Sequence, residues 1–217
     1  MIYAELILAC LLAYLLGSIP TSVWVGKWFF NLDIRSMGSG NAGATNTIRV
    51  LGLKAGIPVL IFDVFKAWMA VTLARWLGDG VFTPNQDVIY RIVLGALAVL
   101  GHVYPVFAGF RGGKGVASLV GVVIALYPQS FLVILVFFTV MMVATRIVSV
   151  SSMSSAIIFP FVVIFLFNET RLPLIVLALA IALFVPYTHR ENIKRLLRGT
   201  EKKFDFGKNS ISNKSKG

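Results

Sequence analysis

Long apolar runs alternate with short polar stretches along the whole chain. Seven apolar segments stand out, and they cover residues 4–26, 55–77, 88–107, 116–127, 130–145, 149–168 and 171–187. A helix of about 20 apolar residues is long enough to cross a bilayer. Backbone groups in lipid must form hydrogen bonds within their own segment, which favours helices over strands. The pattern therefore predicts an all-α integral membrane protein with seven transmembrane helices.

The fourth and fifth apolar segments are the weakest part of this prediction. Both are shorter than a full crossing requires, and a polar Tyr-Pro-Gln-Ser stretch at residues 127–130 separates them. The pattern leaves open whether 116–127 crosses the bilayer fully or only in part.

Charge asymmetry predicts the orientation of the chain. Residues 27–54 and 108–115 are rich in bases, whereas residues 78–87 carry two aspartates and no base. The tail, 188–217, holds nine Lys or Arg against three acids. Bases accumulate in cytoplasmic loops. We therefore expect both loops and the tail to be cytoplasmic and the N-terminus to lie outside. Seven crossings satisfy this, whereas treating 116–145 as a single span would place the basic tail outside.

Composition agrees with a single polytopic membrane domain over residues 1–217. The chain is 58% hydrophobic and 13% charged, with a net charge of +11. In a membrane protein this charge indicates cytoplasmic loops, anionic lipid head groups and anionic substrates rather than nucleic acid. The polar end of the tail, from Lys208 to Gly217, is predicted to be disordered.

The first cytoplasmic loop contains a dense polar motif. It reads S-M-G-S-G-N-A-G-A-T-N from Ser36 to Asn46, and Arg49 follows it. Glycines allow several backbone N–H groups to point into one concavity, which can bind an anion. The side chains that add hydrogen-bond donors are Ser39, Asn41, Thr45 and Asn46. Arg49 adds a charged fork suited to phosphate, so we favour an anion site over a plain linker.

The second cytoplasmic loop is short and leads straight into an apolar helix. It consists of Arg111, Gly112, Gly113, Lys114 and Gly115. Backbone N–H groups at a helix N-terminus, beside a lysine, can hold a phosphate. The loop lacks the Walker A spacing. G-G-K-G is weak evidence alone, but its predicted place on the same face as the first motif favours a phosphate site over a simple connector.

The tail begins with a third motif, T-H-R-E-N-I-K-R-L-L-R-G-T-E, from Thr188 to Glu201. Residues 189–198 are predicted to form a short helix, with Thr188 as its cap and Gly199 at its end. The bases alone would suit a helix on an anionic membrane surface. They do not explain His189 and Asn192, which are three residues apart and can face one site.

Several buried polar residues have more than one interpretation. Asp63 and Lys66 can pair within the second span, either as a structural pair or as part of a site. His102 is either a buried core histidine or a support for the G-G-K-G loop. The serines at 149, 151, 152, 154 and 155 are predicted to allow close helix packing.

Taken together, the three motifs resemble the bacterial acyl-phosphate:glycerol-3-phosphate acyltransferases. The stretches G-S-G-N-x-G-A-T-N, G-H-x-x-P-V-F-x-x-F-R/K-G-G-K-G-V-A and H-R-x-N-I-x-R-L-x-x-G-x-E occur in order. Arg111 replaces the usual Lys, and Ser118 the usual Thr. The resemblance implies seven transmembrane helices and a site at the cytoplasmic face of the inner membrane. It also implies acyl transfer from acyl phosphate to the 1-hydroxyl of glycerol 3-phosphate, giving lysophosphatidic acid and phosphate without cofactor or metal.

We assign the candidate site residues to two phosphates. The leaving phosphate is expected to contact Lys114 and the N–H groups of Gly112, Gly113 and Gly115. The phosphate of glycerol 3-phosphate is expected to contact Arg49, Ser39, Asn192 and His189. Asn41, Thr45 and Asn46 either shape the first loop or contact substrate. The general base is either His189 or a substrate phosphate oxygen, and the resemblance favours the phosphate.

Membrane lipid and the enzyme that makes acyl phosphate are further expected partners, and nucleic acid is not. The alternative function is a membrane transporter of small phosphate esters. It would place its site near the bilayer midplane between internal repeats, and no repeat is visible.

Overall fold

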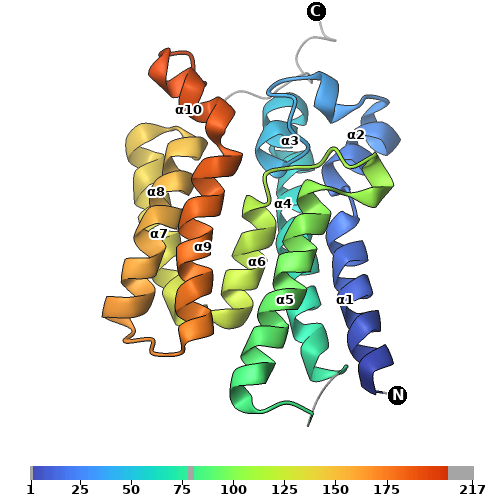
Figure 1. The fold of residues 1–217 in the computed structure, drawn as a ribbon. Coiled ribbons are helices and arrows are strands. Elements are labelled where there is room, and N and C mark those ends of the chain that lie inside the picture. Colours follow the sequence, from blue (N-terminus) through green and yellow to red (C-terminus); the bar gives the residue numbers. More distant parts are fainter. Residues whose placement is uncertain (1, 78–80, 205–217) are drawn as a thin grey trace, which may run out of the picture.

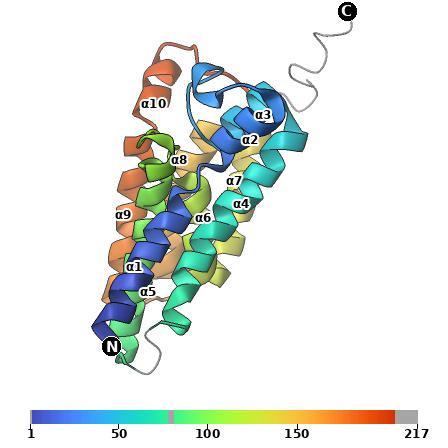
Figure 2. The same cartoon turned by 90° about the vertical axis from the view of Figure 1, so that its right-hand side faces the viewer.

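The computed structural model describes residues 2–77 and 81–204, and this part of the chain is helical and contains no strand. The predicted disorder of Lys208 to Gly217 falls outside the described residues. Every predicted apolar segment contains a helix, and together these helices form a bundle (Figures 1 and 2). They are α1 (Ile2–Ser18), α4 (Leu53–Thr72), α5 (Pro84–Val103), α6 (Val116–Leu126), α7 (Pro128–Thr145), α8 (Val148–Phe161) and α9 (Leu172–Thr188).

The first apolar segment is not one straight helix, which corrects the prediction for residues 4–26. α1 ends at Ser18, and α2 (Thr21–Phe30) continues at an angle of 43° after the break at Pro20. Proline has no backbone N–H and cannot continue the hydrogen-bond ladder of a helix. The predicted loop 27–54 is also more ordered than expected, because it contains the end of α2 and a further helix, α3 (Ala44–Leu51).

Helix length and composition support four to six membrane crossings. Four helical stretches are long and apolar enough on their own, and two more candidates are bent helix pairs. α6 has 11 residues and is about 16 Å long, roughly half of a bilayer core. The protein is therefore a multi-pass membrane protein, and the seventh predicted crossing depends on how α6 is placed in the membrane.

Small residues allow the central helices to pack at close range. A Cβ atom on Gly17 would lie 2.1 Å from the carbonyl oxygen of Ala98, where α1 crosses α5. A Cβ on Gly121 would lie 2.1 Å from the carbonyl oxygen of Val64, where α6 crosses α4. Lipid gives no hydrophobic drive for helix association, so such close contacts stabilise the bundle through packing.

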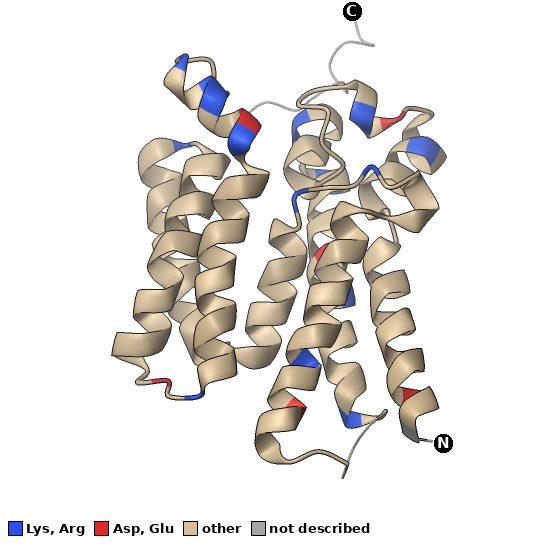
Figure 3. Ribbon diagram, viewed as in Figure 1, with Lys and Arg blue, Asp and Glu red and all other residues tan. Residues whose placement is uncertain are grey.

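The three polar motifs lie at one end of the bundle, opposite the N-terminus. α2, α3, the loop before α6 and α10 (Arg190–Leu197) all lie at this end (Figure 1). Lys and Arg residues are concentrated there (Figure 3). The N-terminus of α1, the end of α4 and the turns that follow α6 and α8 lie at the opposite end. The structure thus brings the motifs together as the one-face prediction requires.

Cysteine labelling tests the orientation. In a Cys10→Ser background, Ser36→Cys and Arg198→Cys should react with an impermeant maleimide only after right-side-out vesicles are opened. Asn85→Cys and Thr170→Cys, at the opposite end, should react in sealed vesicles. All four native side chains are exposed, so accessibility should follow the side of the membrane. Labelling of Ser36→Cys and Arg198→Cys from opposite sides would contradict a shared site.

Candidate active site

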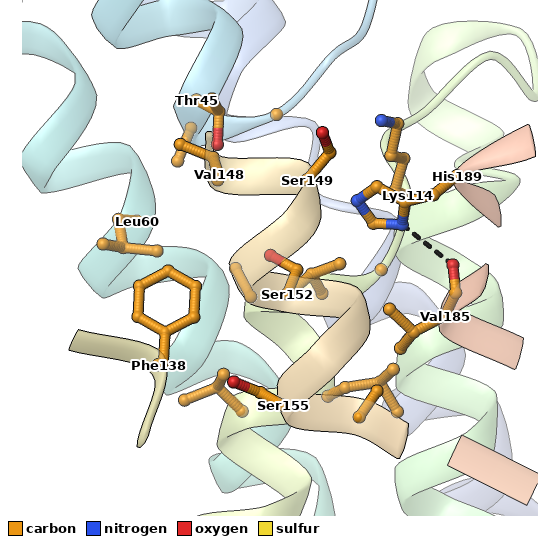
Figure 4. A pocket seen from close by; sticks show the side chains of 18 of the residues that line it. Thr45, Leu60, Lys114, Phe138, Val148, Ser149, Ser152, Ser155, Val185 and His189 are labelled. Atoms are coloured by element: carbon orange, nitrogen blue, oxygen red, sulfur yellow. Dashed lines mark hydrogen bonds between the residues drawn. The ribbon is translucent and has the colours of Figure 1, made fainter. Parts of the chain in front are cut away.

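A cavity of about 500 Å³ opens at the end of the bundle that carries the motifs. Its polar part is lined by Ser39, Asn41, Thr45, Arg49, Lys114, Ser149, His189, Asn192 and Glu201. The rest lies between helices and is mostly apolar, with Leu60, Val64, Val120, Val123, Phe131, Leu135, Phe138 and Phe159 among its lining residues. Figure 4 shows Lys114, His189 and Ser149 near one end and Leu60 and Phe138 farther along. The cavity could hold an amphiphile with a polar head and an apolar tail.

Lys114 joins the second motif to the third. It extends from the loop before α6, and its Nζ donates a hydrogen bond to Oδ1 of Asn192 in α10. The pKa of Lys114 is lowered to about 8, chiefly by burial and also by repulsion from Arg195 and Arg49, while Glu201 opposes the shift. Lys114 therefore stays charged at neutral pH, in a place where its charge is poorly solvated.

Glu201 is the centre of the hydrogen bonds at the polar end. Its Oε1 accepts from Ser149 Oγ at 2.8 Å and from Asn192 Nδ2 at 2.6 Å. Its Oε2 accepts from Arg195 Nε at 2.6 Å. Burial alone would raise the pKa of Glu201, but these hydrogen bonds lower it below its usual value, so the carboxylate is charged.

Ser149 and Glu201 were missed as site residues. The sequence suggested only a packing role for Ser149, whereas Glu201 is the last residue of the third motif and an acid within a basic tail, which is the signal that could have found it. Ser149 begins a row on α8 that continues with Ser152 and Ser155 along the cavity (Figure 4).

His189 is buried between α9 and α10. Its Nδ1 lies 2.8 Å from the carbonyl oxygen of Val185, and because a carbonyl only accepts, Nδ1 carries the proton. Burial lowers the pKa of His189 to about 4, and repulsion from Lys114 adds to the effect. His189 is thus neutral at pH 7, with a free lone pair on Nε2. Thr188 does not cap α10 as predicted, because its hydroxyl donates to Val185 instead.

Asn46 shapes the first motif. Its Oδ1 accepts from the backbone N–H of Ser39 at 2.8 Å, and its Nδ2 donates to the carbonyls of Ile34 and Met37, both at 3.0 Å. Gly38 packs against this amide with a φ of +65°, where a Cβ would lie 2.2 Å from Oδ1. The amide of Asn46 is therefore already used in holding the loop.

Other side chains of the first motif are placed to meet a ligand. Ser39, Asn41, Thr45 and Arg49 all line the cavity. Burial lowers the pKa of Arg49, although Glu201 opposes the shift. The guanidinium remains charged and is the strongest donor that α3 offers to an anion.

The second motif differs from the predicted nest. The N–H groups of Gly112 and Gly113 donate to the carbonyls of Val103 and His102 at the end of α5, both at 3.1 Å, so they are not free to bind an anion. Neither glycine lines the cavity, and Arg111 is exposed away from it. Gly115 does line the cavity. There the first turn of α6 offers N–H groups without intrahelical partners.

Asp63 and Lys66 form the predicted pair, with 2.7 Å between Nζ and Oδ1. Only Asp63 lines the main cavity. Within residues 2–77 and 81–204, no three His, Cys, Asp or Glu side chains gather as metal ligands would.

Comparison with known proteins identifies the family. Residues 7–199 match the sequence model of a family described as glycerol-3-phosphate acyltransferase. The chain belongs to this acyltransferase family. An enzyme of that name from Listeria monocytogenes is 46% identical over 202 residues, covering 93% of this chain and 98% of the relative. One from Enterococcus faecalis is 42% identical over 210 residues, covering 94% of both.

Solved structures agree with the family assignment. The fold is similar to a crystal structure of PlsY, an integral membrane glycerol 3-phosphate acyltransferase, in its glycerol 3-phosphate form. The TM-score is 0.82 at 35% identity, covering 92% of this chain and 96% of that one. The lysophosphatidic acid form gives 0.79 at 34% identity, covering 92% and 95%. This chain is therefore a PlsY-type acyltransferase of phospholipid synthesis, which favours the enzyme over the transporter.

The pKa of Lys114 predicts the alkaline side of the acyltransferase pH profile. The value of kcat/KM reports groups in the free enzyme and should fall as pH rises through about 8, because Lys114 then loses its charge. Arginine keeps its charge at every pH at which the enzyme can be assayed, so the decline near pH 8 should be absent in Lys114→Arg. The control is Lys203→Arg, at an exposed position that does not line the cavity. An unchanged decline in Lys114→Arg would show that Lys114 does not control this limb.

Proposed function

We propose that this acyltransferase uses acyl phosphate as its donor. It transfers the fatty acyl group to the 1-hydroxyl of glycerol 3-phosphate and releases lysophosphatidic acid and phosphate. The observation that carries this proposal is the division of the cavity, with Lys114, Asn192 and Arg49 at its polar end and apolar side chains beyond. A single phosphate attached to a fatty chain matches that division.

The cavity suits acyl phosphate better than acyl-CoA. Acyl phosphate needs one cationic subsite next to an apolar channel, and Lys114 beside the first turn of α6 supplies it. Acyltransferases that use acyl-CoA usually carry H-x-x-x-x-D, but the fifth residues after His102 and His189 are Phe107 and Lys194.

The acceptor phosphate is assigned to residues of the first and third motifs at the same polar end. Arg49 and Ser39 come from the first motif, and His189 and Asn192 from the third. Arg49 offers the planar fork that pairs with phosphate oxygens. The similar PlsY structure in its glycerol 3-phosphate form supports this substrate for the present chain.

The reaction needs positioning and charge stabilisation more than covalent help from the protein. The 1-hydroxyl oxygen attacks the carbonyl carbon, the bond from that carbon to the phosphate oxygen breaks, and phosphate leaves with the electron pair. Lys114 stabilises the negative charge that develops on the leaving group. An acyl phosphate is already activated, so bringing the two substrates together removes much of the barrier.

A substrate phosphate is the better acceptor for the hydroxyl proton. His189 has a free Nε2, but a pKa of about 4 makes it a weak base at neutral pH. A phosphate monoester has a second pKa near 6, closer to the working pH. We therefore assign His189 to positioning the acceptor and the proton to a phosphate oxygen.

The proposed setting is the bacterial inner membrane, with seven crossings, an outside N-terminus and a cytoplasmic site. The motif end of the bundle carries most of the bases, which suits the cytoplasmic face. The apolar helices run between the two ends of the bundle. The proposal counts short α6 as a crossing, which brings the total to seven.

Two alanine substitutions separate the roles of the cations. Lys114→Ala should lower kcat by about 10²–10³, because the lost contact is strongest in the transition state. Arg49→Ala should chiefly raise KM for glycerol 3-phosphate, because it removes ground-state binding. Steady-state kinetics of purified enzyme measure both, with exposed Lys203→Ala and Arg198→Ala as controls. Near-normal turnover of Lys114→Ala would mean that the G-G-K-G loop only connects helices.

A donor assay tests the proposed reaction itself. Purified protein in detergent or lipid should convert acyl phosphate and glycerol 3-phosphate to lysophosphatidic acid, with release of an equal amount of phosphate. EDTA should not inhibit, and acyl-CoA should fail as donor. Activity with acyl-CoA and none with acyl phosphate would overturn the donor assignment while leaving the family assignment intact.

A further inference from the structure

A buried polar cluster lies beside the catalytic cavity, deep in the bundle, and the proposed reaction does not use it. Its buried members are Asp63 and Lys66 on α4 and His102 near the end of α5, and half-buried Thr21 at the start of α2 joins them. Asp63 Oδ1 contacts Lys66 Nζ at 2.7 Å and Thr21 Oγ1 at 3.2 Å. His102 Nδ1 lies 3.5 Å from the same oxygen, longer than a regular hydrogen bond, and this buried nitrogen has no hydrogen-bond partner among the described residues. One carboxylate oxygen thus touches three elements.

Lys66 extends the cluster to the break in the first apolar segment. Its Nζ donates to the carbonyl of Ile19 at 2.8 Å, just before Pro20 interrupts the helix. Thr21 lies just after the break and donates to Asp63. Asp63 and Lys66 together therefore fix where α2 leaves α1.

His102 connects the same cluster to the G-G-K-G loop. Its backbone carbonyl accepts the N–H of Gly113 at 3.1 Å. Its ring lies directly under that residue, because a Cβ on Gly113 would be 2.2 Å from Nε2. The next residue is Lys114. A rotation of the His102 ring would therefore push against the loop that carries the lysine.

Stability alone does not explain an ion pair at this depth. Taking two charges out of water is costly, and apolar replacements of a buried pair are often neutral or stabilising. Ionisable groups within membrane segments are expensive and usually functional. The contacts of Asp63 point to a geometric role.

We propose that Asp63 is a positioning residue for Lys114. It holds the ring of His102 in the orientation on which Gly113 rests, and so it sets where the Lys114 ammonium enters the cavity. Lys66 neutralises Asp63 and anchors it to the α1–α2 break. The inference rests on the proposed role of Lys114 at the leaving phosphate.

A charge-balanced double substitution separates positioning from stability. Asp63→Asn with Lys66→Met removes both charges, so neither is left buried alone, and the protein should unfold within a few degrees of wild type. We expect kcat to fall at least about tenfold with KM for glycerol 3-phosphate changed less than about twofold. The same exchange at the surface pair, Asp87→Asn with Arg91→Met, is the control. Wild-type kcat in a folded double variant would overturn the proposal.

An isosteric pair at His102 gives a second, independent outcome. His102→Asn keeps a donor near the position of Nδ1, whereas His102→Leu has a similar shape and no donor. We expect several-fold higher kcat for the asparagine variant at similar melting temperatures. Equal turnover of the two His102 variants would contradict the proposal. This holds even if the double variant at Asp63 and Lys66 fails to fold. Each variant kcat is compared with the wild-type kcat, measured with a donor that the wild-type enzyme accepts. Failure of acyl phosphate as a donor would therefore be recognised in the wild type and would not be mistaken for an effect of Asp63 or His102.

Discussion

The carboxylate of Glu201 is the contact on which the polar end of the cavity depends. Lys114, Arg49 and Arg195 approach the same space, where like charges repel strongly because water is scarce. Glu201 accepts hydrogen bonds from Arg195 and Asn192. Its charge also raises the pKa values of Lys114 and Arg49 toward their usual values. The site can therefore keep excess positive charge, as the two phosphates of the proposed substrates require.

The same contact ties together parts that are distant in the sequence. Asn192 accepts from Lys114 and donates to Glu201, so the second motif, α10 and the tail form one network. Ser149 brings α8 into it. The polar end is held by hydrogen bonds across elements, whereas the apolar remainder is formed by helices that pack through small residues such as Gly121.

Much of this arrangement could be predicted from the sequence because its signals are local. The apolar runs predicted the helices, and the charge bias predicted that the motifs lie at one end of the bundle. The family that the motifs resemble was confirmed. Tertiary contacts could not be predicted. The amides of Gly112 and Gly113 are taken by carbonyls of α5, and Glu201 meets Ser149 only in the folded chain, 52 positions apart. Composition also could not predict that the chain bends at Pro20 into two helices at an angle to each other.

Product inhibition tests the central claim, that Lys114 holds the leaving phosphate, most directly. Inorganic phosphate should compete with acyl phosphate and not with glycerol 3-phosphate. Its inhibition constant should rise at least about tenfold in Lys114→Ala, as expected for the loss of a charge-assisted contact. It should stay unchanged in Lys203→Ala. Competition with glycerol 3-phosphate alone, or an inhibition constant that does not respond to Lys114→Ala, would contradict the account.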